Sequence, residues 1–153
     1  AASKPAPGPA PLTRADVEAA QALWGSSIAS ISKAHADGGD FVAVAGEAAG
    51  RLYGYGHGNV LFKPTKATRN PFRPTAEDAM SYFVGADAMS NDKFVGEDAG
   101  FAINGGKGWS SCVYDNHQVE LKGGIGIAMV EKFIFSHGIS NPNHSEIEQQ
   151  QCL

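Results

Sequence analysis

Apolar residues recur every three or four positions along the first helix-length stretch of the chain. The series consists of Val17, Ala20, Trp24, Ile28 and Ile31. This spacing puts the five side chains on one face of an α-helix. Thr13 is a favourable N-cap with Asp16 at the third helical position, and Gly38 follows the last periodic residues. The pattern predicts one long amphipathic helix from Thr13 to Asp37.

Two shorter helices are predicted further along the chain. Asp40 can cap a helix that runs to about Tyr53, and its many Ala and Gly residues allow close packing against a neighbour. Thr75, with Asp78 three residues later, makes a capping-box-like start to another helix, which ends near Gly85. The segment between these helices is rich in Gly and Pro, which is typical of turns.

From Gly108 the hydrophobic pattern changes to a period of two, which is typical of β-strands. The alternation runs through residues 109–121. Lys122-Gly123-Gly124 then resembles a hairpin turn, and it leads into a strand that begins at Ile125 and ends at Phe135. The last third of the chain therefore predicts an antiparallel sheet.

Two shorter apolar runs are also interpreted as strands. One covers residues 60–62 and is ended by Pro64, because proline cannot donate to a strand ladder. The other covers residues 101–103, within a long loop over residues 86–107. A long helix first and a meandering sheet last predict an α+β fold, with the helices on one face of a curved antiparallel sheet.

The chain has 153 residues and 42% hydrophobic content, which suits one domain with its own core. Prolines at positions 5, 7, 9 and 11 predict an extended arm over residues 1–12. The α+β domain is expected over residues 13–137, and a polar irregular tail over residues 138–153. The chain begins with Ala-Ala-Ser, which suggests an N-terminus already processed by removal of a targeting segment or a tag.

Charge and hydropathy exclude two classes of partner. The net charge is −4 and the twelve Lys and Arg residues are scattered, so no basic surface is expected to attract nucleic acid. No apolar run approaches the roughly 18 to 20 residues that span a bilayer. The sequence therefore predicts neither a nucleic-acid-binding protein nor a membrane-spanning one.

The candidate chemistry lies between Asn59 and Gly85. Thr65 follows the short strand predicted at residues 60–62, and Tyr82 lies on the helix capped by Thr75. Their hydroxyl groups could converge on one pocket as polar groups within an apolar wall. The spacing alone leaves a second interpretation open, in which the Thr65 hydroxyl satisfies a backbone group in the turn and Tyr82 is an ordinary half-buried aromatic.

No metal or cofactor is predicted. Cys112 and Cys152 form neither a disulfide framework nor a CxxC motif. The five His residues are dispersed along the chain, whereas a zinc site needs its ligands together on fixed elements. His137, His144 and Glu146 in the tail could at most bind a divalent ion adventitiously.

Three motifs occur in a characteristic order: Leu-Phe-Lys-Pro-Thr at 61–65, Phe-Arg-Pro-Thr at 72–75 and Ser-Tyr-Phe-Val-Gly at 81–85. Further matching segments lie on both sides, and they are Leu23-Trp24-Gly25, Ile31-Ser32-Lys33-Ala34, Gly100-Phe101-Ala102, Trp109, Tyr114-Asp115-Asn116 and Ile127-Ala128-Met129. Together they resemble the iota-class carbonic anhydrases, a branch of the SnoaL-like, cone-shaped α+β superfamily. The resemblance covers roughly residues 13–135.

The resemblance implies metal-independent hydration of carbon dioxide to bicarbonate, with no cofactor. Thr65 and Tyr82 match pocket positions of the family and are the expected catalytic residues. The other residues expected around the substrate pocket are Trp24, Phe62, Tyr114 and Asn116. Algal members of the class include plastid proteins, so the resemblance also implies a location in the plastid (chloroplast).

After Ser136 the sequence departs from this family. Its members continue with two further strands that end in a His-His-Ser-Ser motif, which supplies pocket residues. This chain continues after Gly138 with ISNPNHSEIEQQQCL, and His137, His144 and Ser145 do not reproduce the spacing of that motif. We therefore expect the two terminal strands to be missing. The strand from Ile125 to Phe135 would then be an open edge, covered by a protein partner or by a second copy of the chain.

Three classes of function remain open from the sequence. The first is an iota-type carbonic anhydrase that acts through Thr65 and Tyr82. The second is a non-catalytic accessory or interaction subunit of a larger plastid, photosynthetic complex. The third is a SnoaL-type isomerase or cyclase, for which Asp115 is the candidate carboxylate in a predicted strand. Retention of the motifs favours the first class, and the expected loss of strands favours the second.

Overall fold

The structure is a computed structural model, and it describes residues 10–136 together with residues 146–148. The α-helices within these ranges are α1 (Arg14–Ala36), α2 (Phe41–Leu52), α3 (Ala76–Val84) and α4 (Ala86–Met89). Two short 3-10 helices follow, η1 (Asp92–Phe94) and η2 (Phe101–Gly106), and then the strands β1 (Trp109–Lys122), β2 (Ile125–Ser136) and β3 (Glu146–Glu148). In the described part of the chain, no helix is long and apolar enough to cross a bilayer.

The helices begin at the predicted capping residues. Thr13 and Asp16 form a complete capping box at the start of α1. The side chains of Asp40 and Thr75 each accept a hydrogen bond from the backbone N–H three residues later, at the starts of α2 and α3. These three predicted helix starts are confirmed, because each depends on a local contact that the sequence spacing already specifies.

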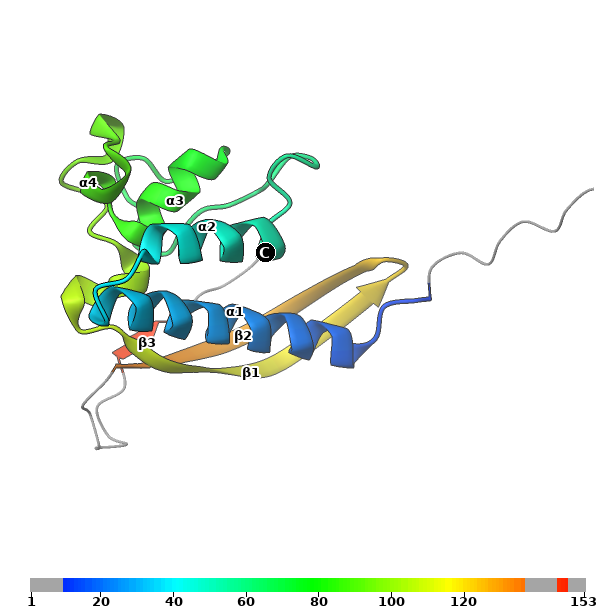
Figure 1. Cartoon of the computed structure of the whole chain (residues 1–153). Coiled ribbons are helices and arrows are strands. Elements are labelled where there is room, and N and C mark those ends of the chain that lie inside the picture. The colour runs from blue at the N-terminus through cyan, green and yellow to red at the C-terminus, as the bar shows by residue number, and fades with distance from the viewer. Residues whose placement is uncertain (1–9, 137–145, 149–153) are drawn as a thin grey trace, which may run out of the picture.

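The sheet is antiparallel in the order β1-β2-β3. β1 and β2 form a long hairpin whose turn contains Gly123 with φ of +62°, a conformation that glycine adopts readily. α1 lies along this hairpin, and α2 packs on the other side of α1 (Figure 1). The predicted α+β class, with helices packed on an antiparallel sheet, is confirmed.

The strand predicted at residues 60–62 is wrong. The segment is an irregular loop in which Leu61 is 98% exposed. The Phe62 carbonyl accepts a hydrogen bond from the backbone N–H of Arg73 (2.9 Å), within the same loop. An apolar run of this length takes up strand structure only when another strand is beside it, and here the loop folds back on itself instead.

The strand predicted at residues 101–103 is also wrong, because these residues begin η2. The Phe101 carbonyl accepts a hydrogen bond from the Trp109 indole (2.7 Å), so a side chain takes the place of a strand partner. Gly100 precedes the helix with φ of +83°, which turns the chain sharply at this point.

The tail contributes a strand that the sequence analysis did not predict. β3 pairs antiparallel with β2 over residues 132–134. The Glu-Ile-Glu sequence of β3 has the alternation of a short strand. The expectation of an edge open along the whole strand from Ile125 to Phe135 is therefore wrong for this end of β2. Residues 1–9, 137–145 and 149–153 lie outside the described ranges, and so do the predictions made for them.

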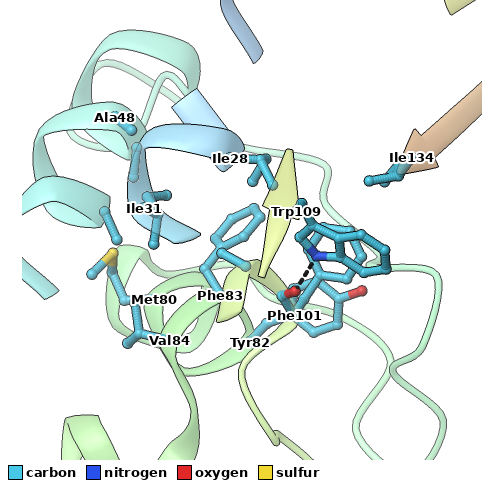
Figure 2. Close-up of a cluster of buried hydrophobic side chains, with 13 residues drawn as sticks. Ile28, Ile31, Ala48, Met80, Tyr82, Phe83, Val84, Phe101, Trp109 and Ile134 are labelled. Atoms are coloured by element: carbon cyan, nitrogen blue, oxygen red, sulfur yellow. Dashed lines mark hydrogen bonds between the residues drawn. The ribbon is translucent and has the colours of Figure 1, made fainter. Parts of the chain in front are cut away.

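The core lies where the helices meet the base of the hairpin, as Figure 2 shows. Trp109 and Ile134 from the hairpin are 2% and 1% exposed. The backbone N–H of Trp109 donates to the Ser32 hydroxyl on α1 (2.8 Å), and its indole donates to Phe101 in η2. Trp109 thus fixes both α1 and η2 against β1.

Candidate functional site

The loop between α2 and α3 carries Thr65, and a buried ion pair fixes this loop. Arg73 Nη2 donates to Asp98 Oδ1 (2.8 Å), and the two side chains are 0% and 1% exposed. Ser81 Oγ donates to Asp98 Oδ2 (2.7 Å), and the guanidinium lies 3.7 Å from the centroid of the Phe94 ring. Because buried charges need their partners, this pair ties the loop to α3 and to the segment after η1.

Glu97 holds the middle of the same loop. Its carboxylate accepts hydrogen bonds from the backbone N–H groups of Thr68 (2.7 Å), Arg69 (2.7 Å) and Asn70 (3.2 Å). Desolvation raises the pKa of Glu97, but these bonds and one from the Asn70 amide outweigh it and lower the pKa to about 2. An ionised carboxylate thus satisfies three consecutive N–H groups of an irregular loop.

Tyr82 reaches the site from α3. The residue is 7% exposed. Its ring stacks on Phe101 at a centroid distance of 5.5 Å and an interplanar angle of 12°, and it meets Phe62 edge-on at 6.2 Å. These two contacts hold the tyrosine ring in one orientation against rings from a loop and from η2. Figure 2 shows Tyr82 beside Phe101 and Phe83 at the edge of the core.

A small cavity lies between these elements. It is lined by aromatic rings, a proline, two hydroxyl-bearing side chains and one lysine: Trp24, Phe62, Pro64, Thr65, Tyr82, Phe101 and Lys132. The volume open to a water-sized sphere is about 20 Å³, enough for one ordered water. The cavity unites four of the residues singled out from the sequence, namely Trp24, Phe62, Thr65 and Tyr82. Their catalytic and substrate-binding roles stay predictions.

Tyr114 and Asn116 do not line this cavity. The Tyr114 ring meets Trp24 edge-on at a centroid distance of 6.1 Å and so supports the wall from behind. Asn116 exchanges two hydrogen bonds with Gln21 of α1 (2.7 and 2.8 Å). Both residues border a separate, open groove of about 460 Å³ between α1 and β1, and the exposed Asp115 lies there too. The carboxylate suggested for isomerase chemistry therefore does not face the cavity.

Lys132 and Phe101 are wall residues that the sequence analysis missed. Lys132 is 3% exposed, and its Nζ lies 4.2 Å from the Trp24 ring centroid. The alternation along β2 was the available signal, because it puts Lys132 on the same face as the buried Ile134. Phe101 was singled out only as part of a matching motif and of a predicted short strand, and nothing in its spacing pointed to the cavity.

Cys112 lies on β1, where it borders the open groove between α1 and β1, and is partly buried. Burial raises the pKa of its thiol to about 11, although the Lys132 charge opposes this. The thiol is thus protonated at neutral pH and is a poor nucleophile or metal ligand. Within the residues that the structure describes, no group of three His, Cys, Asp or Glu side chains is arranged to hold a metal ion. His137, His144 and Ser145 lie outside these residues.

Comparisons with known proteins agree on one family. Residues 15–146 match the family described as metal-independent carbonic anhydrase. A metal-independent carbonic anhydrase of Nostoc sp. (strain PCC 7120) is 35% identical over 121 residues, which cover 77% of this chain and 55% of the relative. The chain therefore spans about half the length of this curated relative.

A solved structure has a similar fold. The crystal structure of an iota-carbonic anhydrase from a cyanobacterium, complexed with bicarbonate, superposes with a TM-score of 0.67 and 26% sequence identity. The superposition covers 97% of this chain and 100% of that one.

Proposed function

The chain belongs to the metal-independent carbonic anhydrase family, and from this premise we propose that it hydrates carbon dioxide to bicarbonate in the cavity between Thr65 and Tyr82. The observation that carries the proposal is that two hydroxyl-bearing side chains, Thr65 and Tyr82, line one small cavity with mostly aromatic walls. The bicarbonate bound in the similar cyanobacterial carbonic anhydrase supports the same product.

The cavity suits this reaction because it has both apolar and polar walls. The substrate of the reaction, carbon dioxide, is apolar, and its product, bicarbonate, is charged. The rings of Trp24, Phe62 and Phe101 form a wall that accepts carbon dioxide without hydrogen bonds. The hydroxyls of Thr65 and Tyr82 can each donate one hydrogen bond, to an oxygen that becomes more negative as water adds to the carbon. Each can also accept a hydrogen bond and so orient the attacking water. The proton that this water loses as bicarbonate forms passes to the solvent.

The test is a carbon dioxide hydration assay on the purified chain, with and without a chelator. We expect activity that the chelator leaves unchanged. Thr65→Ala and Tyr82→Phe should each lower kcat/KM by about 100- to 1,000-fold, as loss of one donor to a developing negative charge does in other enzymes. Thr68→Ala is the matched control, because Thr68 is exposed in the same loop and outside the cavity. Activity unchanged in both cavity variants would refute this site.

The accessory-subunit alternative has no support in the structure or the comparisons, and we do not propose it. We do propose that a second copy of the chain or another protein covers the part of β2 before residue 132. Among the described residues, that part pairs with β1 alone, and Ile125 and Ile127 are 64% and 56% exposed. Native mass spectrometry of the purified chain tests this proposal, and a monomer both there and in cell extract would contradict it.

A plastid location is likewise a proposal. Its support is the resemblance to the iota class, which includes plastid proteins of algae. A fluorescent fusion of the full-length protein that coincides with chlorophyll fluorescence would support it, and a signal elsewhere in the cell would refute it.

A further inference from the structure

A second, larger cavity adjoins the one that Thr65 lines. The volume open to a water-sized sphere is about 140 Å³, and the lining comes from Lys66, from α3 and from residues between 97 and 105. Tyr82 and Phe101 line both cavities. Their rings stack at a centroid distance of 5.5 Å, so this ring pair lies between the two spaces. We call the space lined by Lys66 the polar cavity and the one lined by Thr65 the aromatic cavity.

The two cavities differ in their chemistry. The lining of the polar cavity includes two acidic residues, Glu97 and Asp98, and the polar residues Lys66 and Asn104. Walls of this kind hold water, and the volume is sufficient for several molecules. The aromatic cavity is mostly apolar and holds about one water. The structure thus places a reservoir for water on the far side of the Tyr82 and Phe101 rings.

The proposed reaction consumes one water and releases one proton in every turnover. Carbon dioxide and water give bicarbonate and a proton, and a buffer base in the solvent finally takes up that proton. Because the aromatic cavity has room for about one water, this water must be replaced after each turnover. Protons move along chains of hydrogen-bonded water, but aromatic rings and a proline offer no such chain. The polar cavity supplies what the aromatic one lacks.

We propose that the polar cavity is the route by which water reaches the site and the proton leaves it, past the rings of Tyr82 and Phe101. An O–H bond of the attacking water breaks as its oxygen bonds to the carbon, and a new O–H bond forms on a water of the polar cavity. That water passes a proton on to the solvent, so the number of protons in the cavity is unchanged after the turnover. The inference rests on the proposed function for the reaction itself.

The charges of the lining favour a proton over an anion. Hydrogen bonds lower the pKa of Glu97 to about 2, so its carboxylate is ionised at neutral pH. The donors of these bonds are uncharged, and they include the Asn70 amide. Asp98 forms an ion pair with Arg73, and Lys66 is exposed, where solvent screens its charge. A carboxylate beside the water attracts a hydrated proton and repels bicarbonate.

The first experiment fills the polar cavity and leaves the proposed catalytic residues in place. Ala99 is exposed and lines the polar cavity but not the aromatic one. In Ala99→Phe, kcat for hydration should fall about 10-fold or more, because water and proton transfer lose their route. The ratio of kcat in H₂O to kcat in D₂O should rise, since proton transfer becomes the slow step. A distorted site would lower kcat without raising this ratio, and that result would contradict the proposal.

Ala22→Phe is the matched control. It makes the same change of residue at an exposed position that lines the open groove between α1 and β1. We expect kcat and its isotope ratio to stay close to those of the wild type. Equal losses in the two variants would indicate a general effect of an added ring and would overturn the proposed route.

The second experiment blocks the polar cavity reversibly in a folded chain. Ala99→Cys is made together with Cys152→Ser and is treated with benzyl methanethiosulfonate, which attaches a benzyl group through a disulfide. Cys112 reacts slowly, because burial raises the pKa of its thiol to about 11. The chain with Cys152→Ser alone, treated in the same way, is the control. We expect kcat to fall on labelling and to recover when dithiothreitol removes the group. Complete labelling by mass spectrometry with unchanged kcat would refute the route.

The outcomes separate this proposal from the proposed function. A wild-type chain that hydrates no carbon dioxide refutes the proposed function, and the route with it. An active wild-type chain whose kcat is unaffected by the benzyl group at position 99 refutes the route alone. An active chain whose kcat falls on labelling, with a larger isotope ratio, and recovers on reduction supports both.

Discussion

The two walls of the cavity are held in place by different interactions. Thr65 lies in the irregular loop between α2 and α3, which is fixed by the buried Arg73–Asp98 pair and by the Glu97 carboxylate. Lys132 lies on β2, whose backbone pairs with β1 on one side and with β3 on the other. One wall therefore depends on a few charged side chains, and the other depends on a continuous ladder and on packing.

This difference determines what each wall tolerates. A loop held by two carboxylates should be sensitive to changes of charge, because each carboxylate serves several partners at once. Acid should destabilise the loop through Glu97, whose pKa is lowered, and not through Asp98, whose pKa is raised by burial. A hairpin packed under α1 should be sensitive to changes of volume, because its backbone pairing continues whatever the side chains are. The predictions below test this contrast, beginning with the largest expected effect.

Asp98→Asn should have the largest effect. It leaves the Arg73 guanidinium buried without its charged partner, and breaking such a pair typically costs about 3–5 kcal/mol. Urea unfolding followed by circular dichroism measures the loss. Arg14→Met is the control: it breaks the pair with Glu18, in which the two side chains are 56% and 51% exposed, and should cost about 0–1 kcal/mol. Equal losses in the two variants would contradict the special role of the buried pair.

Ile134→Ala tests the hairpin wall near the cavity. Ile134 is 1% exposed, so its truncation should leave a void and cost about 2–5 kcal/mol. Val95, after η1, is 54% exposed and lies outside the surface that we propose is covered, and Val95→Ala should change the stability by less than about 0.5 kcal/mol. The same unfolding measurement compares them. Equal losses in the two variants would contradict the role of Ile134 in the core, and a large loss in Ile127→Ala would support the proposed cover over β2 before residue 132.

Gly25→Val tests the close contact between α1 and β1. A Cβ atom at Gly25 would lie 3.0 Å from Cys112 Cβ, so a valine must push the helix away from the strand. Such overpacking typically costs about 1–3 kcal/mol. Gly46→Val on α2 is the control with the same change of residue, because a Cβ there meets nothing within 4 Å. Similar unfolding midpoints for the two variants would refute a tight contact.

Glu97 should make the stability of the loop wall depend on pH, but only in acid. This is the smallest of the expected effects, because the stability does not change with the protonation of Glu97 near neutral pH. Its pKa falls from about 4.5 to about 2 on folding, so the stabilisation is complete above pH 4.5 and is lost as the pH falls toward 2. The difference in stability between the wild type and Glu97→Gln should shrink over this window. Glu47→Gln, on an exposed face of α2, removes the same charge as a control. A difference that is constant from pH 6 to pH 2.5 would contradict the assignment.

Much of the fold could be read from the sequence, because local contacts determine it. The caps at Thr13, Asp40 and Thr75 need only a side chain and the backbone three residues later. The period of two after Gly108 specifies the β1–β2 hairpin, since its turn and its alternation lie within one continuous segment. The motifs also pointed to Thr65 and Tyr82, which the fold brings to one cavity.

Only the tertiary structure decided the rest, because it depends on partners that are distant in the chain. Residues 60–62 have a strand-like pattern, but no strand of the described chain lies beside them, and Arg73 closes the loop instead. Asn116 was predicted to line the pocket. Its side-chain amide instead exchanges two hydrogen bonds with Gln21, which is almost a hundred positions away in the chain, and it lies outside the cavity. The sequence analysis did not single out Lys132, and only the packing of Trp24 and Phe101 puts its ammonium group against their rings. The spacing of residues along the chain predicts on which face of a helix or strand a side chain lies. The energy of a buried charge, by contrast, depends on the groups that the rest of the fold packs against it.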